Sequence, residues 1–307
     1  MSEKIVGIVG GGLMGVGIAI KFALTGYKTV LYEAFPARRT EIPAAMQEIL
    51  GELIEENVLS PEKSTAAVAR ILLTADFAAL KDAAIIIEAI PEVLPLKQEL
   101  YQKLEALVSP SALIASNTSG FMPDVLSAKM AHRGRFLITH FWNPPHAVRL
   151  VEVVPGSATT QAYVDLTMKV MREIGSEPVL LRTPLPGFIG NRLQYAVLRE
   201  ALHIVHSGAA DAATVDTVMK ASLGPRYSVM GPLEAADFGG LETFYKIASH
   251  LMPELAKDEG MLELLRQHVE KGDKGAATGR GFYEWPEAKK RAIRKKRLQQ
   301  YLRNRAP

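Results

Sequence analysis

The sequence predicts a two-domain protein: an α/β domain with a doubly wound parallel sheet, followed by an all-α helical domain. Up to about residue 181, short apolar runs alternate with longer segments of helical periodicity. Beyond residue 187 the signal is helical alone. The segment 183–187 between them holds two prolines and a glycine, which is typical of a linker. We therefore expect domains over residues 1–186 and 187–307.

The first elements of the chain form its most informative stretch. An apolar run over residues 5–9 is followed at once by Gly10-x-Gly12-x-x-Gly15, and apolar residues then recur at helical spacing until Gly26. In such a turn the first glycine permits the tight bend and the second lets the backbone approach a pyrophosphate. The third glycine lets the helix pack closely on the strand. A second apolar run, residues 29–32, ends in the acid Glu33.

This strand–turn–helix–strand unit predicts a dinucleotide site in a domain of the Rossmann type. The N-terminus of the helix offers free N–H groups and a positive partial charge to the phosphates. Glu33 can accept hydrogen bonds from ribose hydroxyls and would repel a 2′-phosphate, so we expect NAD rather than NADP. Arg38 and Arg39 lie close by and oppose this preference. The expected cofactor-binding residues of this unit are Gly10, Gly12, Leu13, Met14, Gly15 and Glu33.

The rest of the first domain follows the same alternation. Residues 83–89 are mostly apolar with a run of isoleucine, as in a strand buried on both faces. Further strands are expected at 71–73, 113–115, 136–140, 150–154 and 178–181, and helices at 41–57, 95–107 and 160–174. Strands separated by helices favour a parallel sheet with both faces covered.

The second domain is predicted to be entirely helical. Residues 188–206 carry apolar side chains on one face, with a period of 3.6. Further helices are expected from Asp211 to just before Gly224, over residues 232–252 and over 260–270. The final residues, 286–307, form a basic tail with nine Lys or Arg and one acid, and this tail is also expected to be helical.

Charge is distributed unevenly along the chain. The net charge is +3, but the basic tail alone carries +8, which leaves −5 for the remainder. We interpret the tail as a solvated helix whose side-chain stems pack on the body. The alternatives are binding of nucleic acid or another anionic surface, or a role over a neighbouring subunit's anionic ligand. No nucleic-acid partner is expected.

Composition excludes several kinds of chemistry. The chain has no cysteine, so it can form neither disulfides nor thiolate metal ligands, and no metal site is predicted. Its 48% hydrophobic residues are enough for a sizeable core. No apolar run is long enough to span a bilayer, and no targeting segment is visible, so we expect a cytoplasmic protein without a membrane partner.

Polar side chains stand at the carboxyl ends of the predicted strands, where open α/β sheets bind their ligands. They are residues 116–119 and His140, and Glu152 lies within the adjoining predicted strand 150–154. Oxidation of a secondary alcohol needs a base for the hydroxyl proton, and histidine titrates near neutral pH. A carboxylate on an adjoining strand, such as Glu152, would fix the tautomer of the imidazole. Each residue also has a structural interpretation, His140 as a satisfied residue after a strand and Glu152 as an edge residue facing water.

A series of motifs then occurs in order along the chain. These motifs are Gly10-x-Gly12-x-x-Gly15 with Met14, Glu88-Ala89-Ile90-x-Glu92, Ser116-Asn117-Thr118-Ser119, His140-Phe141-x-Asn143-Pro144, Leu150-Val151-Glu152-Val153, Pro186-Gly187-Phe188-Ile189-x-Asn191-Arg192 and Gly279-Arg280-Gly281-Phe282-Tyr283. Together they resemble the 3-hydroxyacyl-CoA dehydrogenase family over nearly the whole chain up to about residue 285.

The resemblance implies roles for particular residues. It makes His140 the general base and Glu152 the carboxylate that orients it, with Ser119 and Asn191 bound to the reacting substrate oxygen. Taken alone, Ser119 could be a turn former and Asn191 a residue at the start of a helix. The resemblance also places Glu92, Lys97 and Asn117 beside the cofactor and implies that the helical domain forms a homodimer.

The chain departs from the acyl-CoA members of that family in one respect. Those members carry lysines for the CoA phosphates on the helix after the second strand, whereas residues 40–62 here hold no Lys, Arg or His. Five glutamates lie between Glu41 and Glu56, and they would repel a phosphorylated substrate. The segment 224–234 is similar to the L-gulonate 3-dehydrogenase (lambda-crystallin) branch, which acts on free hydroxy acids. Its arginine, Arg226, is suited to a substrate carboxylate, or else forms a surface ion pair.

Three functional hypotheses follow. The first is an NAD-dependent dehydrogenase of a small free 3-hydroxy acid. The second is a dehydrogenase of 3-hydroxyacyl-CoA thioesters, such as 3-hydroxybutyryl-CoA, that uses the same residues. The third is a non-catalytic, crystallin-like structural or binding protein, against which the intact set His140, Glu152, Ser119 and Asn191 argues.

Overall fold

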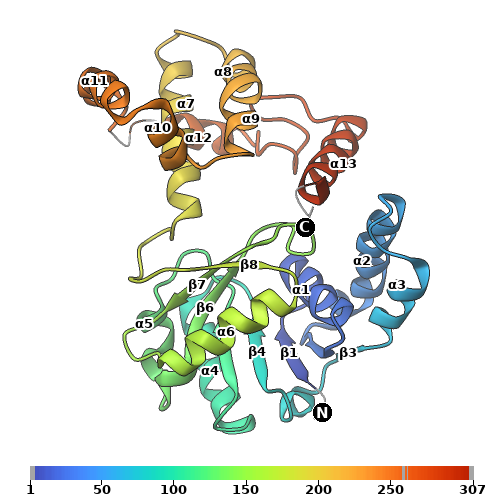
Figure 1. Ribbon diagram of the computed structural model, residues 1–307. Coiled ribbons are helices and arrows are strands. Elements are labelled where there is room, and N and C mark those ends of the chain that lie inside the picture. The colour runs from blue at the N-terminus through green and yellow to red at the C-terminus, as the bar shows by residue number, and fades with distance from the viewer. Residues whose placement is uncertain (1–3, 258–259, 261, 304–307) are drawn as a thin grey trace. The chain divides into compact units, whose positions relative to one another are not determined.

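The computed structural model describes residues 4–257, 260 and 262–303. These residues divide into two compact units (Figure 1). Unit 1 runs to Gly190 and also includes the chain from Lys296 onward, and unit 2 is Asn191–Lys295. The boundary thus falls just after the predicted linker, and the second half of the basic tail belongs to unit 1.

Unit 1 is built on one eight-stranded sheet with the strand order β3-β2-β1-β4-β5-β6-β7-β8. The predicted parallel sheet is confirmed for the first six strands, whereas β7 and β8 run in the opposite direction, because β6 and β7 pair antiparallel while every other neighbouring pair is parallel. The strands are β1 (Ile5–Val9), β2 (Lys28–Tyr32), β3 (Ile71–Thr74), β4 (Ile85–Glu88), β5 (Leu113–Ser116), β6 (Phe136–Phe141), β7 (Leu150–Pro155) and β8 (Glu177–Leu180).

The helices of unit 1 lie on both faces of this sheet (Figure 1). They are α1 (Leu13–Leu24), α2 (Pro36–Glu55), α3 (Pro61–Val68), α4 (Leu94–Leu107), α5 (Pro123–Leu126) and α6 (Gln161–Glu173). Helix α2 begins at Pro36, earlier than expected, because proline suits the first turn of a helix. The sequence reasoning missed α3, which starts with Pro61 after the capping side chain of Ser60.

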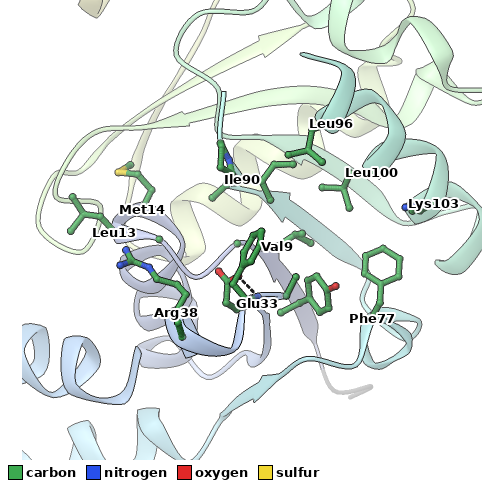
Figure 2. Close-up of a pocket in the computed structure, with 18 of the residues that line it drawn as sticks. Val9, Leu13, Met14, Glu33, Arg38, Phe77, Ile90, Leu96, Leu100 and Lys103 are labelled. Atoms are coloured by element: carbon green, nitrogen blue, oxygen red, sulfur yellow. Dashed lines mark hydrogen bonds between the residues drawn. The ribbon is translucent and has the colours of Figure 1, made fainter. Parts of the chain in front are cut away.

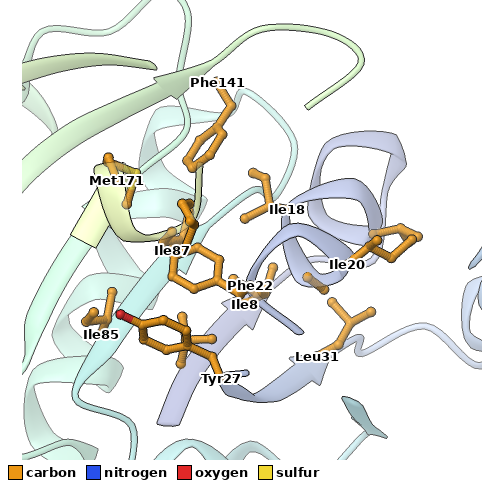
Figure 3. Packing of buried hydrophobic residues seen from close by; sticks show 14 of the residues in the cluster. Ile8, Ile18, Ile20, Phe22, Tyr27, Leu31, Ile85, Ile87, Phe141 and Met171 are labelled. Atoms are coloured by element: carbon orange, nitrogen blue, oxygen red, sulfur yellow. The ribbon is translucent and has the colours of Figure 1, made fainter. Parts of the chain in front are cut away.

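Two hydrophobic clusters cover the two faces of the sheet. Alternate strand residues point to opposite faces, so Ile85 and Ile87 belong to one cluster and Ile86 to the other. The first cluster packs α1, α2 and α6 on the sheet, and Figure 3 shows Ile18 and Phe22 of α1 against Ile8 and Ile87. The second cluster packs α4 and α5 on the opposite face. The strands that carry the site are therefore held from both sides.

Unit 2 is helical, and none of its described residues belongs to a named strand. Its helices are α7 (Gly190–His206), α8 (Ala212–Val218), α9 (Gly224–Tyr227), α10 (Pro232–Gly239), α11 (Leu241–Leu251), α12 (Leu262–Glu270) and α13 (Glu287–Arg303), of which α7 begins and α13 ends in unit 1. A π-helical turn, Met219–Leu223, joins α8 to α9, so the helix does not stop before Gly224 as expected. Pro225 has no N–H to donate, and the wider turn before it accommodates that loss.

The expected helix over residues 232–252 is also interrupted. Gly240 has a φ of +92°, which separates α10 from α11. The last turns of the basic helix α13 pack within unit 1, where Gln299 donates a hydrogen bond of 3.0 Å to Glu56 and Leu302 packs against the first cluster. Leu298 in the same turns is 5% exposed. No described helix is both long enough and apolar enough to cross a membrane.

Candidate active site

The glycine-rich turn between β1 and α1 has the geometry that a dinucleotide requires. Gly10 has a φ of +106°, and a Cβ on Gly15 would lie 1.8 Å from the carbonyl oxygen of Gly10, so neither position accepts a side chain. Around Gly12, in contrast, a Cβ would meet no atom within 4 Å. Gly12 precedes α1 with no side-chain cap, so the N–H groups of the first turn remain open to phosphate oxygens.

A cavity of about 1140 Å³ opens beside this turn (Figure 2). Five predicted cofactor residues line it, namely Gly10, Gly12, Leu13, Met14 and Glu33. Its other walls are largely apolar and include Phe77 and the α4 side chains Leu96 and Leu100, which Figure 2 shows across the cavity from Leu13. An apolar slot joined to an open helix N-terminus fits the adenosine and pyrophosphate parts of NAD.

Glu33 brings a negative charge to the β2 side of this cavity. Its carboxylate is fixed by the backbone, with Oε2 accepting from the N–H of Gly11 at 2.8 Å and Oε1 from the N–H of Phe35 at 2.9 Å. Arg39 donates to the backbone oxygens of Glu33 and Ala34. Arg38 pairs with Glu41 at 2.9 Å. Both arginines therefore have partners within the protein.

A buried polar cluster lies at the end of β4. The Glu88 carboxylate is fully buried and accepts hydrogen bonds from Lys97, Tyr101, Ser116 and the N–H of Ile90. The distances from its oxygens to Lys97 Nζ and to the Tyr101 hydroxyl are both 2.5 Å. Burial and the neighbouring Glu88 raise the pKa of Tyr101 well above its usual value.

Lys97 is 1% exposed, and its ammonium group contacts protein oxygens on several sides. Besides Glu88 it reaches Glu92 at 3.2 Å and the carbonyl oxygen of Ile90 at 3.3 Å. Glu92 also accepts a hydrogen bond from the hydroxyl of Thr118 in the loop after β5. The predicted cofactor residues Glu92 and Lys97 thus join the ends of β4 and β5.

Asn117 and Ser119 follow β5 in the same loop. The side-chain oxygen of Asn117 accepts from the N–H of Phe141 at 2.8 Å, which ties the end of β5 to the end of β6. Ser119 is exposed in that loop. The strand ends of β4, β5 and β6 are therefore linked through polar side chains.

His140 and Glu152 lie opposite each other in the antiparallel pair β6–β7. Directly opposed residues present their side chains on the same face, and the Nδ1 atom of His140 lies 2.8 Å from Oε2 of Glu152. Glu152 is fully buried and His140 is 6% exposed. If Nδ1 carries the proton, Nε2 is left with a lone pair for an external proton.

The Glu152 carboxylate accepts three further hydrogen bonds. They come from the indole N–H of Trp142 at 3.2 Å and the backbone N–H groups of Ile189 and Gly190 at 2.8 and 2.9 Å. Burial alone would raise the pKa of Glu152, but the hydrogen bonds from His140, Gly190, Ile189 and Trp142 outweigh it and lower this pKa. Glu152 is therefore an anion at neutral pH.

Two predicted site residues belong to unit 2. Asn191 is half-buried in the first turns of α7, and Arg226 is exposed in α9. Among the described residues, no group of three His, Asp or Glu side chains is arranged to hold a metal ion.

Sequence reasoning assigned no role to Glu88, Trp142, Phe188 or Gly190, although all stand in motifs that it quoted. Glu88 could have been recognised, because an acid that ends a run of isoleucine needs a buried partner. The linker residues gave no comparable signal, because their contact with Glu152 depends on the return of the chain past β7.

Comparison of the chain with known proteins shows the family to which it belongs. Residues 5–183 match the family model for the NAD binding domain of 3-hydroxyacyl-CoA dehydrogenase, and residues 187–285 match the model for its C-terminal domain. The chain is 33% identical to a 3-hydroxybutyryl-CoA dehydrogenase of Bradyrhizobium diazoefficiens, over 93% of this chain and 97% of the relative. It is 35% identical to a lambda-crystallin homolog of Bos taurus, over 75% of this chain and 72% of the relative.

A similar solved structure is that of 5-formyl-3-hydroxy-2-methylpyridine 4-carboxylic acid 5-dehydrogenase, described as an NAD⁺-dependent dismutase. It superposes with a TM-score of 0.91 at 27% identity and covers 99% of this chain and 97% of that chain. The match of both domain models confirms the NAD cofactor and the resemblance seen in the motifs. The chain therefore belongs to the 3-hydroxyacyl-CoA dehydrogenase family, whose members are NAD-dependent dehydrogenases acting on a CH–OH group.

Proposed function

We propose that this protein oxidises the 3-hydroxyl group of a small, free 3-hydroxy carboxylic acid to the 3-oxo acid with NAD, and catalyses the reverse reaction. The observation that carries the catalytic part is the buried pair of His140 and Glu152, joined at 2.8 Å at the carboxyl end of β6. A neutral imidazole held by a carboxylate anion is a competent general base.

In this mechanism Glu152 accepts the Nδ1–H of His140 and so presents Nε2 to the substrate hydroxyl. His140 takes the hydroxyl proton, and the Glu152 anion stabilises the resulting imidazolium. NAD, when bound, would supply the acceptor for the hydride that leaves the substrate carbon. In the reverse direction the imidazolium returns its proton to the forming alkoxide.

Three further residues are proposed to bind the substrate. Ser119 in the loop after β5 and Asn191 in α7 donate hydrogen bonds to the reacting oxygen. Arg226 in α9 binds the carboxylate, because a guanidinium can hold both carboxylate oxygens at once. The cofactor is proposed to contact Gly10, Gly12, Leu13, Met14, Gly15, Glu33, Glu92 and Asn117, with Lys97 behind Glu92.

The choice of a free acid rests on the acidic character of residues 40–62, which follow Arg38 and Arg39 in α2. Five glutamates between Glu41 and Glu56 stand where acyl-CoA members of the family carry lysines, and residues 40–62 contain no base. The related pyridine carboxylic acid dehydrogenase, by its name, acts on a small free acid, and its structure covers nearly the whole of this chain. Both observations support a substrate without a nucleotide.

A 3-hydroxyacyl-CoA substrate is the second candidate. The 3-hydroxybutyryl-CoA dehydrogenase relative supports it, and so does the basic helix α13. Gln299 of α13 bonds to Glu56 at the end of α2, so the last turns of α13 bring positive side chains to unit 1. These cations could meet CoA phosphates in place of lysines on α2.

We also propose that unit 2 pairs with a second copy of the chain. Large apolar side chains on α10, on α11 and in the turn before them are exposed, among them Val229 at 82%, Leu233 at 84%, Phe238 at 85% and Tyr245 at 74%. Soluble proteins rarely leave such a surface open to water, so a homodimer contact over α10 and α11 accounts for it.

A matched substrate panel tests the choice of substrate. Free 3-hydroxy acids and their CoA thioesters are assayed with NAD, and kcat/KM is compared within each pair. The free acid should be preferred, and Arg226→Met should raise its KM by about 10–150-fold, the worth of a charge-assisted contact of roughly 1.5–3 kcal/mol. Arg226→Lys should restore only part of the loss. A thioester preference of tenfold or more, with Arg226→Met indifferent, would establish the second candidate instead.

The proposed base is tested separately. His140→Ala should lower kcat by roughly 10²–10⁴-fold, because positioned acid–base catalysis contributes about that much. NADH binding, followed by nucleotide fluorescence, should barely change, which shows that the fold is intact. Near-normal turnover in this variant would remove His140 from the mechanism.

A further inference from the structure

One carboxylate joins the proposed base to the linker at the end of the first stretch of unit 1. Oε2 of Glu152 accepts from Nδ1 of His140 at 2.8 Å and from the indole N–H of Trp142 at 3.2 Å. Oε1 accepts from the backbone N–H groups of Ile189 and Gly190, the last residues of unit 1 before α7 continues into unit 2. The imidazole, the indole and the linker thus share a single buried anion.

Aromatic rings hold the imidazole on two sides. The ring of Trp142 lies 5.6 Å from that of His140, and the ring of Phe188 lies 5.3 Å from it, both tilted by about 55°. Phe188 is 1% exposed and has a φ of +52°, a left-handed conformation that residues other than glycine rarely adopt. Such a conformation persists where the surrounding contacts enforce it, so the packing around Phe188 fixes the linker backbone here.

The linker also packs directly on the indole. A Cβ at Gly190 would lie 2.2 Å from Cζ2 of Trp142 and 3.0 Å from Cε2. Any side chain at this position would push the indole or the linker away from Glu152. The absence of a side chain at residue 190 is therefore a condition of this contact.

We propose that Trp142 and the backbone N–H groups of Ile189 and Gly190 are positioning groups for the base. They hold the Glu152 anion in place, so the position of the linker affects the orientation and the proton affinity of His140. This inference rests on the proposed role of His140. Because Oε2 is shared, the indole N–H withdraws electron density that would otherwise stabilise a protonated imidazole. Loss of this donor should favour the imidazolium, so that at a given pH less of the enzyme holds the neutral imidazole that accepts the substrate proton.

Glu152 is the ionisable group in hydrogen-bond contact with His140. The neighbouring rings of Trp142 and Phe188 carry no charge. The other ionisable side chains on adjoining elements are His146 and Arg149 in the loop after β6, Glu177 in β8, and Glu88, Glu92 and Lys97 around the end of β4. Arg149 forms an ion pair with Glu177, and Lys97 forms one with Glu88, so each of these charges is balanced by its partner.

Trp142→Phe removes the N–H and keeps an aromatic ring in the pocket. In the oxidation direction, the acid limb of the profile of kcat/KM against pH should move upward by about half a unit to one unit, the worth of one hydrogen bond. The KM for NAD should stay unchanged. Trp285→Phe, at the second of the two tryptophans, is the matched control and should leave the limb in place. Lower activity at every pH without movement of the limb would mean that Trp142 only fills space.

A second measurement needs no turnover. In the Trp285→Phe background Trp142 is the sole tryptophan, and a charged imidazolium quenches a neighbouring indole. Its fluorescence should fall as pH is lowered, and Glu152→Gln in the same background should move the midpoint to lower pH. An unchanged midpoint would overturn the coupling. Turnover of His140→Ala would instead refute the proposed function, so the two failures can be told apart.

Gly190→Ala tests the linker contact itself. Its Cβ should displace the indole, lower kcat by about tenfold or more, and move the acid limb in the same direction as Trp142→Phe does. Gly51→Ala is the matched control, because a Cβ there meets nothing within 4 Å. A Gly190→Ala enzyme with the kcat and pH profile of Gly51→Ala would show that the linker does not act on the base.

Discussion

Glu33 sets the charge of the cavity beside the glycine-rich turn. Its carboxylate is held by the N–H groups of Gly11 and Phe35, and the nearby arginines are bound to Glu41 and to backbone oxygens. Arg38 also lines the cavity, but it is paired with Glu41 there. At the scale of a single residue, we predict that this carboxylate selects NAD over NADP.

We expect Glu33→Ala to lower kcat/KM for NAD by about tenfold or more, because a charge-assisted hydrogen bond to the ribose is worth roughly 1.5–3 kcal/mol. The ratio of NADP to NAD activity should rise, since the repulsion of the 2′-phosphate is gone. Glu99→Gln, at another acid lining the same cavity, should leave that ratio unchanged. Equal ratios in wild type and Glu33→Ala would exclude Glu33 as the selector.

Glu152 also makes folding depend on pH. Its native pKa lies below the usual 4.5, because four hydrogen bonds to the anion outweigh its burial. A lowered native pKa contributes stability that is present above the usual pKa and is lost as pH falls through the native one. Glu152 therefore lowers the free energy of unfolding as the pH becomes acidic.

Glu152→Gln should accordingly cost about 1–3 kcal/mol of the free energy of unfolding at pH 7, because its donors lose their anionic acceptor. The deficit should shrink as pH is lowered below the usual pKa of a carboxyl group, since the wild-type residue is then protonated as well. Urea unfolding of both proteins at neutral and acid pH measures the difference. Parallel stability curves across that range would contradict this account.

Two elements, β4 and α4, are joined by a charged pair in the interior. Glu88 and Lys97 are 0% and 1% exposed in their side chains and lie 2.5 Å apart. Removal of one partner strands the other charge in a medium that solvates it poorly. The neighbouring pair Glu99–Lys103, also on α4, has a similar distance of 2.7 Å, but both side chains are 62% exposed. The two pairs differ mainly in burial.

Lys97→Met should therefore lower the free energy of unfolding by about 3–5 kcal/mol, whereas Lys103→Met should cost at most about 1 kcal/mol. The double variant Glu88→Gln with Lys97→Met should recover part of the loss, because no buried charge then lacks a partner. Urea unfolding gives all these values. A double variant as unstable as the sum of its single variants would show that the two side chains act independently.

At the scale of the elements, the sequence predicted most strands and helices, but it did not predict the direction of every strand or the residue at which every helix ends. Apolar runs and the 3.6 period are local signals, so they can be read without the fold. The reversal of β7 and the continuation of the helix through Gly224 depend on neighbours far along the chain. Local propensity does not contain that information.

For the molecule as a whole, the exposed apolar residues of α10 and α11 bear on its assembly. Leu233→Asp and Phe238→Asp should weaken the proposed dimer by about 30-fold or more, since central apolar contacts are commonly worth 2 kcal/mol or above. Sedimentation of a dilution series measures this. Leu72→Asp, at a residue of unit 1 that is 55% exposed, should leave the mass unchanged. A wild-type protein that sediments as a monomer would contradict the proposal.

The sequence by itself determined the dinucleotide unit, the order of strands and helices, and the family. The first two depend on residues close together in the chain, such as Gly10, Gly12, Gly15 and Glu33, and the family depends on the order in which several such short motifs occur. Only the tertiary structure decided that Glu152 lies opposite His140, that Lys97 is buried on Glu88, and that the linker at Gly190 closes on the same carboxylate. These contacts join residues from different strands and helices, so they exist only once the sheet order, the strand direction and the path of the linker are set.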